Sequence, residues 1–333
     1  MRACFGLRFR GPCVHNRNSS KEGAIVQPAR VVDYLVYVAV RLLICVVQAI
    51  PLETGVRMAR GLAWLMANVV RLRGEVVDEN LRHAFASLSG EQRRRLTSRM
   101  WEHLFLLVME VSHAPRKIHE TNWRQYVRLK NIGPLVAELL SERPTMIVTA
   151  HFGNFEAGGY LLGILGFPTY AVARPLDNPF LNRFVNRFRG ATGQYIVPKN
   201  GGYDQILAVL GRGGTLSLLA DQYAGPKGCW VRFFDRPASA HKAIALLALE
   251  HQALVAVTYA RRAEQPMRFE MCCAAMADPR DAEFSSAGVP ALTQWYTRQL
   301  EDFIRCWPEQ YWWVHRRWKD TRKKKKPSAS QAA

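Results

Sequence analysis

Residues 151–156 have the sequence H-F-G-N-F-E and bring an imidazole and a carboxylate within five positions of each other. Gly153 permits a tight turn and Asn154 can cap a helix, so the chain can fold Glu156 back toward His151. Such a pair suits general-base chemistry, because the carboxylate holds the imidazole in one tautomer while the imidazole takes a proton from an attacking hydroxyl. An isolated H-x-x-x-x-E also arises by chance, and a strand-end histidine with ordinary local hydrogen bonds is the simpler interpretation of the motif alone.

Three further segments place polar or charged side chains after predicted strands and near the end of the chain. They are residues 173–179 (A-R-P-L-D-N-P), 219–222 (L-A-D-Q) and 308–319 (P-E-Q-Y-W-W-V-H-R-R-W-K). Where a carbonyl develops negative charge, the backbone N–H groups of Gly153 and Asn154, or the guanidinium of Arg174, can stabilise it. Arg174 can instead grip a phosphate, and Asp221 can orient Arg174 or the acceptor. A surface arginine and a turn aspartate are the ordinary interpretations of these two residues.

The elements that would position these residues alternate between strand and helix. The apolar run T-M-I-V-T-A at 145–150 is typical of a strand buried on both faces of a parallel sheet. Later strands are predicted at 168–173, 195–197, 215–220, 253–260 and 267–275, and helices at 155–165, 178–190, 203–211, 240–251 and 289–306. This alternation predicts an α/β fold with a central, mostly parallel sheet flanked by helices. Active residues in such sheets gather at the carboxyl ends of strands, where His151 lies.

An α-helical region with a strongly apolar first segment precedes the predicted sheet. The twenty residues 31–50 are mostly apolar and end at Pro51, but they contain Asp33 and Arg41. This segment can be a buried core helix, a helix lying in the membrane interface or a true membrane span, and the pattern favours none of the three. From residue 55 to residue 111 the apolar positions recur at helical spacing.

We therefore divide the chain into four parts. Residues 1–30 are predicted to be a basic disordered extension, and residues 31–51 a membrane-associating helix. Residues 52–320 are predicted to hold a helical region and the α/β domain, and residues 321–333 a lysine-rich tail.

The composition bounds the class of protein. The 333 residues carry a formal net charge of +19, with 49% hydrophobic and 22% charged residues. This excludes a small disulfide-bonded protein, a disordered tail protein and a polytopic transporter, and it favours an anionic partner such as nucleic acid, an acidic carrier protein or a phospholipid surface. Residues 1–30 contain six basic residues and one acid, and residues 316–326 contain eight basic residues and one acid. The intervening chain is only mildly basic, as expected for a globular enzyme with basic ends.

In their order and spacing, the four segments make the chain resemble the late lipid A acyltransferases, a lysophospholipid-acyltransferase-like family, over residues 31–320. The motifs of that family fall on His151 and Glu156, on Arg174 and Pro175, on Asp221 and Gln222, and on Trp313, His315, Arg316, Arg317 and Lys319.

The resemblance implies transfer of a fatty acyl group from an acyl carrier protein or acyl-CoA thioester to a hydroxyl of a glycolipid such as a lipid A precursor. It implies no metal, no cofactor and no covalent acyl-enzyme. We expect no nucleic-acid partner, and we expect the 31–50 helix, the tryptophans and the basic ends to hold the protein on an anionic membrane surface, at the cytoplasmic face of the inner membrane. We expect His151 to be the general base and Glu156 its partner. The expected substrate contacts are Gly153, Asn154, Arg174, Asp221, Gln222 and Arg316.

Two other functions remain open from the sequence. A lipid or thioester hydrolase could use the same His151 and Glu156 with water in place of the alcohol, although no G-x-S-x-G motif is present. A non-enzymatic basic module that binds nucleic acid or membrane is supported only by the charge at the two ends. A zinc protease is excluded more firmly, because the sequence contains no H-E-x-x-H.

Overall fold

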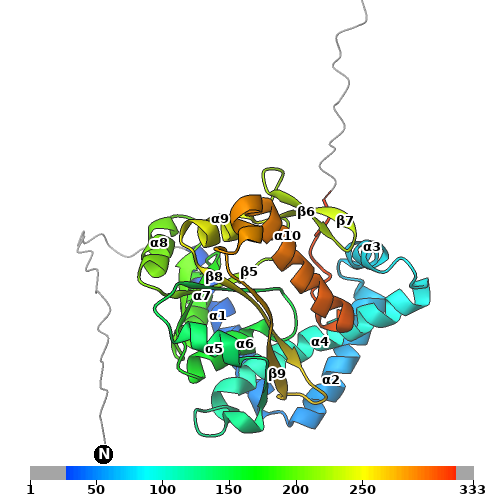
Figure 1. Ribbon diagram of the computed structural model, residues 1–333. Helices are drawn as coiled ribbons and strands as arrows, with labels where there is room; N and C mark the ends of the chain where they lie inside the picture. The colour runs from blue at the N-terminus through cyan, green and yellow to red at the C-terminus, as the bar shows by residue number, and fades with distance from the viewer. Residues whose placement is uncertain (1–27, 320–333) are drawn as a thin grey trace, which may run out of the picture.

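The computed structural model describes residues 28–319, drawn in colour in Figure 1. The predicted lysine-rich tail at 321–333 and nearly all of the predicted extension at 1–30 lie outside the described residues.

Within residues 28–319, seven strands form one sheet in the order β1-β9-β8-β2-β5-β3-β4 (Figure 1). Neighbouring strands are parallel except β8 and β9, which are antiparallel. The predicted α/β fold with a mostly parallel central sheet is therefore confirmed. The strands of the sheet are β1 (Val127–Lys130), β2 (Thr145–Thr149), β3 (Thr169–Ala173), β4 (Gln194–Pro198), β5 (Thr215–Leu219), β8 (Leu254–Arg262) and β9 (Phe269–Ala277).

The helices precede, connect and follow these strands. Before the sheet come α1 (Pro28–Ala49), α2 (Leu52–Trp64), the π-helical turn η1 (Leu65–Val70), α3 (Gly74–Ala84) and α4 (Gly90–Lys117). The later helices are α5 (Gly133–Leu139), α6 (Phe155–Ile164), α7 (Pro179–Gly190), α8 (Tyr203–Gly211), α9 (Lys242–Glu250) and α10 (Ala282–Cys306), with the short 3₁₀ turns η2 (Trp123–Gln125) and η3 (Pro308–Gln310).

Strand β2 lies between β8 and β5 and anchors the core on both faces of the sheet. Successive residues of a strand point to opposite faces. Accordingly, Met146 and Val148 belong to a hydrophobic cluster with α3, α9 and α10, whereas Ile147 belongs to a second cluster with α6. This double burial explains why the strand consists of a continuous apolar run.

Strands β6 (Cys229–Phe233) and β7 (Arg236–Ala240) form a separate antiparallel hairpin in a segment where no strand was predicted. The connecting residues Phe234 and Asp235 have φ angles of 50° and 59°. A two-residue turn with two positive φ angles usually carries Asn-Gly or Asp-Gly, so this turn lacks the usual sequence signal. Strand β1 also escaped prediction, because it is a four-residue strand at the edge of the sheet.

Helix α1 is long and apolar enough to cross a membrane, by length and composition. No residue from 29 to 49 is buried, which is not what a core helix shows. The guanidinium of Arg41 lies 4.9 Å from the ring centroid of Phe184 on α7 and donates a hydrogen bond to Tyr37 at 3.0 Å. Arg41 therefore contacts α7, and many apolar side chains of α1 are exposed.

Helix α4 begins at a capping box. The side chain of Ser89 accepts a hydrogen bond from the backbone N–H of Gln92 at 3.2 Å, and the backbone N–H of Ser89 donates to the Gln92 side chain at 2.7 Å. We expect Ser89→Ala to lower the free energy of unfolding by about 1 kcal/mol, because the first turn loses an acceptor. Urea unfolding in detergent measures this, with Ser98→Ala in the interior of the same helix as control. Equal stability of the two variants would show that the cap contributes nothing.

Candidate active site

The parallel register of β2 and β5 brings two distant residues together. Thr149 is the register partner of Leu219. His151 and Asp221 each lie two residues beyond these positions, at the carboxyl ends of adjacent strands. His151 Nδ1 lies 2.8 Å from Asp221 Oδ1, and both side chains are buried. Topology thus builds a His–Asp pair from residues that are 70 positions apart.

His151 and Asp221 shift each other's pKa. Burial opposes the charged imidazolium, but the charge and hydrogen bond of Asp221 and the nearby charge of Glu156 outweigh it and raise the pKa of His151. Burial of Asp221 would raise its pKa, but the charge and hydrogen bond of His151 prevail and lower it. Asp221 is therefore the carboxylate that holds the imidazole.

Glu156 does not make the hydrogen bond to His151 that the sequence analysis expected. Asn154 caps α6 by accepting from the N–H of Ala157 at 2.9 Å, and Glu156 then lies in the first helical turn. Its carboxylate pairs with Arg189 of α7, with Arg189 Nε 3.0 Å from Glu156 Oε2. Because α6 begins at Asn154, the Glu156 carboxylate reaches Arg189 and not His151. The expected hydrogen bond between Glu156 and His151 is therefore wrong.

The Nε2 side of His151 faces Gln222 and His315. The amide nitrogen of Gln222 lies 3.4 Å from His151 Nε2 and 3.5 Å from His315 Nε2. The ring centroids of His151 and His315 are 5.1 Å apart. Burial and the charge of His151 lower the pKa of His315. The sequence analysis assigned no role to His315, although the C-terminal motif contains it.

The expected oxyanion donors are already engaged. The N–H of Gly153 donates to the carbonyl of Gln310 at 2.9 Å, and the N–H of Asn154 donates to the carbonyl of Ala260 at 2.7 Å. Gly153 has a φ of 58°, and a β-carbon there would overlap the carbonyl of Ala260. These backbone groups hold the loop between β8 and the C-terminal segment, so they are not free to bind substrate.

The structure separates Arg174 from the His–Asp pair. Arg174 Nη2 lies 2.8 Å from Asp177 Oδ1, and the side chain of Arg174 is 77% exposed. Arg174 therefore does not contact Asp221. Arg317 is buried and donates to the carbonyl of Ser239 at 2.7 Å, whereas Arg316 lines a cavity next to the pair.

A buried polar network supports the loop that carries Gly153 and Asn154. Glu110 of α4 accepts from Asn154 Nδ2 at 2.9 Å and from Arg262 Nη2 at 2.8 Å. His103 Nδ1 lies 2.8 Å from Arg262 Nη1, so its Nε2–H donates to the carbonyl of Gly153 at 3.1 Å. Burial and the charge of Arg262 hold the pKa of His103 well below its usual range. Neutral His103 thus fixes the carbonyl group two residues after His151.

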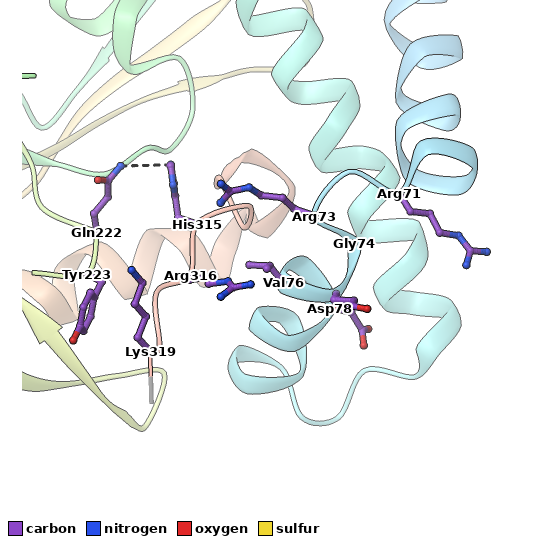
Figure 2. A pocket seen from close by; sticks show the side chains of 11 residues that line it. Arg71, Arg73, Gly74, Val76, Asp78, Gln222, Tyr223, His315, Arg316 and Lys319 are labelled. Carbon is purple, nitrogen blue, oxygen red and sulfur yellow. Dashed lines mark hydrogen bonds between the residues drawn. The ribbon is translucent and has the colours of Figure 1, made fainter. Parts of the chain in front are cut away.

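A cavity of about 1020 Å³ opens beside the pair, and Gln222 and His315 form part of its wall (Figure 2). Its other lining residues are Tyr223, which follows Gln222, and residues from the turn before α3, the start of α3 and the C-terminal segment. Within residues 28–319, no group of three or more His, Cys, Asp or Glu side chains is arranged to hold a metal ion.

Residues 25–320 match the family of bacterial lipid A biosynthesis acyltransferases. A lipid A biosynthesis lauroyltransferase of Escherichia coli K12 is 26% identical over 297 residues, which cover 86% of this chain and 92% of that enzyme. A lipid A biosynthesis palmitoleoyltransferase of the same organism is 24% identical over 257 residues, which cover 75% of this chain and 80% of that enzyme. The solved structure of a 1-acyl-sn-glycerophosphate acyltransferase from Thermotoga maritima is 12% identical, with a TM-score of 0.37, and covers 81% of this chain and 100% of that chain. The family match confirms the resemblance indicated by the four sequence segments.

The His–Asp pair yields a prediction about titration. In Asp221→Asn the raising charge is lost while burial remains, so we expect the pKa of His151 to fall from above its ordinary value of 6.5 to below it. Heteronuclear NMR of ring-labelled histidine as a function of pH measures the change. Glu156→Gln serves as control and should produce a smaller downward shift, because Glu156 acts on His151 through charge alone. A pKa for His151 that Asp221→Asn leaves unchanged would contradict the pairing.

Proposed function

Because this chain belongs to the bacterial lipid A biosynthesis acyltransferase family, we propose that it transfers a fatty acyl group from a thioester to a hydroxyl of a lipid A precursor. The chain is an O-acyltransferase, and the two Escherichia coli relatives are named for transferring lauroyl and palmitoleoyl groups in lipid A biosynthesis. The donor is the thioester of an acyl carrier protein or of coenzyme A.

One observation carries the mechanism: buried Asp221 binds Nδ1 of His151 and leaves Nε2 on the side of Gln222 and His315, which line the cavity. With Nδ1–H donated to Asp221, Nε2 holds the free electron pair of the neutral imidazole. An acceptor hydroxyl that reaches Nε2 can transfer its proton there, which is the role of a general base.

The reaction then proceeds without a covalent acyl-enzyme. The acceptor oxygen gives its proton to His151 Nε2 and forms a bond to the thioester carbonyl carbon. The tetrahedral intermediate collapses by breaking the carbon–sulfur bond, and the leaving thiolate takes the proton from the imidazolium. The products are the ester and the free thiol, and His151 returns to its neutral form.

Asp221 and Glu156 have different parts in this mechanism. Asp221 fixes the tautomer and stabilises the imidazolium that forms during the reaction. Glu156 adds negative charge at longer range, and Arg189 holds it in place. We assign the role of oxyanion donor to the side-chain amide of Gln222, because it lies at Nε2 and the backbone N–H groups of Gly153 and Asn154 are engaged.

We place the enzyme on the cytoplasmic face of the inner membrane, attached through α1. The exposed apolar residues of α1 and its fit to a membrane-crossing length support this attachment.

The reaction is tested by mass spectrometry of lipids from a Gram-negative host that lacks its own late lipid A acyltransferase. The wild-type chain should add one acyl group to lipid A. His151→Ala should cut the rate by about 10²- to 10⁴-fold, the usual contribution of a general base. His119→Ala, at an exposed histidine between α4 and η2, is the matched control and should retain activity within a few fold. Release of free fatty acid without ester formation would instead indicate a hydrolase.

The attachment yields a second test. Leu35, Leu42 and Leu43 of α1 are 61%, 62% and 60% exposed. Replacing all three with Gln should move the protein from the membrane fraction into a salt wash, because each buried leucine contributes about 1.5–3 kcal/mol. The control is Leu140→Gln, which alters an exposed leucine outside α1. If the triple variant stayed in the membrane fraction as the control does, α1 would not be the anchor.

A further inference from the structure

The cavity beside the catalytic pair is rich in cations. Arg71, Arg73, Arg316 and Lys319 all line it. They come from two segments far apart in the sequence, the turn between η1 and α3 and the C-terminal segment. Figure 2 shows Arg73 and Arg316 directed into the space between these segments and Lys319 directed toward Gln222 and Tyr223, whereas Arg71 extends outward at the rim.

Acidic side chains do not neutralise this cluster within residues 28–319. The cavity wall also contains Glu75 and Asp78. Asp78 is bound by Arg93 at 2.6 Å and by Arg82 at 3.1 Å, so its charge is already matched. No ion pair joins a described carboxylate to any of the four cations of the cavity wall. The cavity wall therefore carries more positive than negative charge. Of its two carboxylates, only Glu75 is not already paired with an arginine outside the wall.

The backbone of the turn between η1 and α3, which carries Arg71 and Arg73, is strained. Arg71 and Arg73 have φ angles of 49° and 54°, in the left-handed region that residues other than Gly and Asn seldom adopt. Such strain persists where the surrounding structure enforces it and is typical of functional positions. Arg73 donates to the carbonyl of Val314 at 3.0 Å, which ties the turn to the C-terminal segment. Two distant stretches of chain are thus held so that their cations share one cavity.

The first turn of α3 adds to the attraction for anions. Arg73 is the N-cap of α3 and gives no side-chain hydrogen bond to the first turn, so the positive end of the helix dipole lies uncapped at the cavity wall. Helix α3 has 11 residues, long enough for a developed dipole.

We propose that this cavity binds a phosphate group of the acceptor lipid and thereby presents the acceptor hydroxyl to His151. Arginine suits phosphate because its planar guanidinium donates two parallel hydrogen bonds to phosphate oxygens. A volume of about 1020 Å³ is larger than a phosphate alone and accommodates a phosphorylated sugar headgroup. Gln222 and His315 connect the cavity to the imidazole of His151, so a headgroup anchored by its phosphate has its hydroxyl groups near Nε2.

The proposal rests on the proposed acyl transfer to a glycolipid and adds the feature by which the acceptor is selected. A phosphate could also come from the donor, whose phosphopantetheine arm carries one. The two sources predict different kinetic parameters, because an acceptor site governs the KM for the lipid and a donor site governs the KM for the thioester.

The kinetic test uses the full-length enzyme and the variants Arg316→Gln and Lys319→Gln. Arg316 is exposed, and neither side chain makes a hydrogen bond within residues 28–319, so folding should be preserved. Arg128→Gln, which removes the same charge from edge strand β1, is the control. Each enzyme is assayed with a phosphorylated lipid A precursor and with the same lipid after phosphatase treatment.

We expect each variant to raise the KM for the phosphorylated acceptor at least tenfold with a small change in kcat, and the control to match the wild type. The wild type should prefer the phosphorylated acceptor, and the variants should lose that preference. An equal loss on both acceptors would overturn the proposal. A rise in the KM for the thioester with an unchanged KM for the lipid would also overturn it and assign the cavity to the donor.

A binding measurement separates this proposal from the proposed function. Glucosamine 1-phosphate is titrated into the wild type, Arg316→Gln and Arg128→Gln by calorimetry, with glucosamine as the unphosphorylated probe. Binding of the phosphorylated probe alone, weakened at least tenfold in Arg316→Gln, would support the cavity even if no lipid A precursor were acylated. Equal binding by Arg316→Gln and wild type, or no binding by wild type, would refute it whatever the turnover.

Discussion

The active-site loop depends on one buried ion pair, between Glu110 of α4 and Arg262 of β8. Taking both charges out of water is costly, and the cost is offset only where the remaining hydrogen-bonding positions are filled. Here they are filled: Glu110 also accepts from Asn154 and from the N–H of Met267, and Arg262 also donates to His103. Helix α4, strand β8, the turn between β8 and β9 and the loop after β2 therefore share one set of polar contacts. The loop cannot shift without leaving a buried charge unmatched, and His151 keeps its place as a result.

The His151–Asp221 pair is a consequence of strand register. The loop network fixes where β2 ends, and the pairing of β2 with β5 fixes which residue lies alongside. Asp221 is the residue two positions past β5, where a short buried carboxylate can reach Nδ1 of His151. The neighbouring strand β5 thus sets the partner of His151. Glu156, five positions along the chain, belongs to α6 and pairs with Arg189 instead.

This explains how much the sequence could predict. Apolar runs, alternation and ordered motifs predicted the strands of the main sheet from β2 onward, their mostly parallel arrangement, the position of His151 at a strand end and the family. The pairing with Asp221 did not, because it requires the order of strands in the sheet, which local patterns do not contain. The engaged N–H groups of Gly153 and Asn154 likewise depend on Ala260 and Gln310, which are over a hundred positions away. The hairpin β6–β7 was missed because Phe234 and Asp235 adopt a turn that usually needs glycine.

The C-terminal segment closes over the loop that follows β2. Phe152 forms a β-bridge with Tyr311, the N–H of Trp312 donates to the carbonyl of His151, and Gln310 receives the N–H of Gly153. These contacts join positions that are far apart in the sequence, so the backbone around His151 is held only while the C-terminal segment is docked on the end of β2. Local opening of that segment would release the backbone around His151 while the sheet itself stays folded.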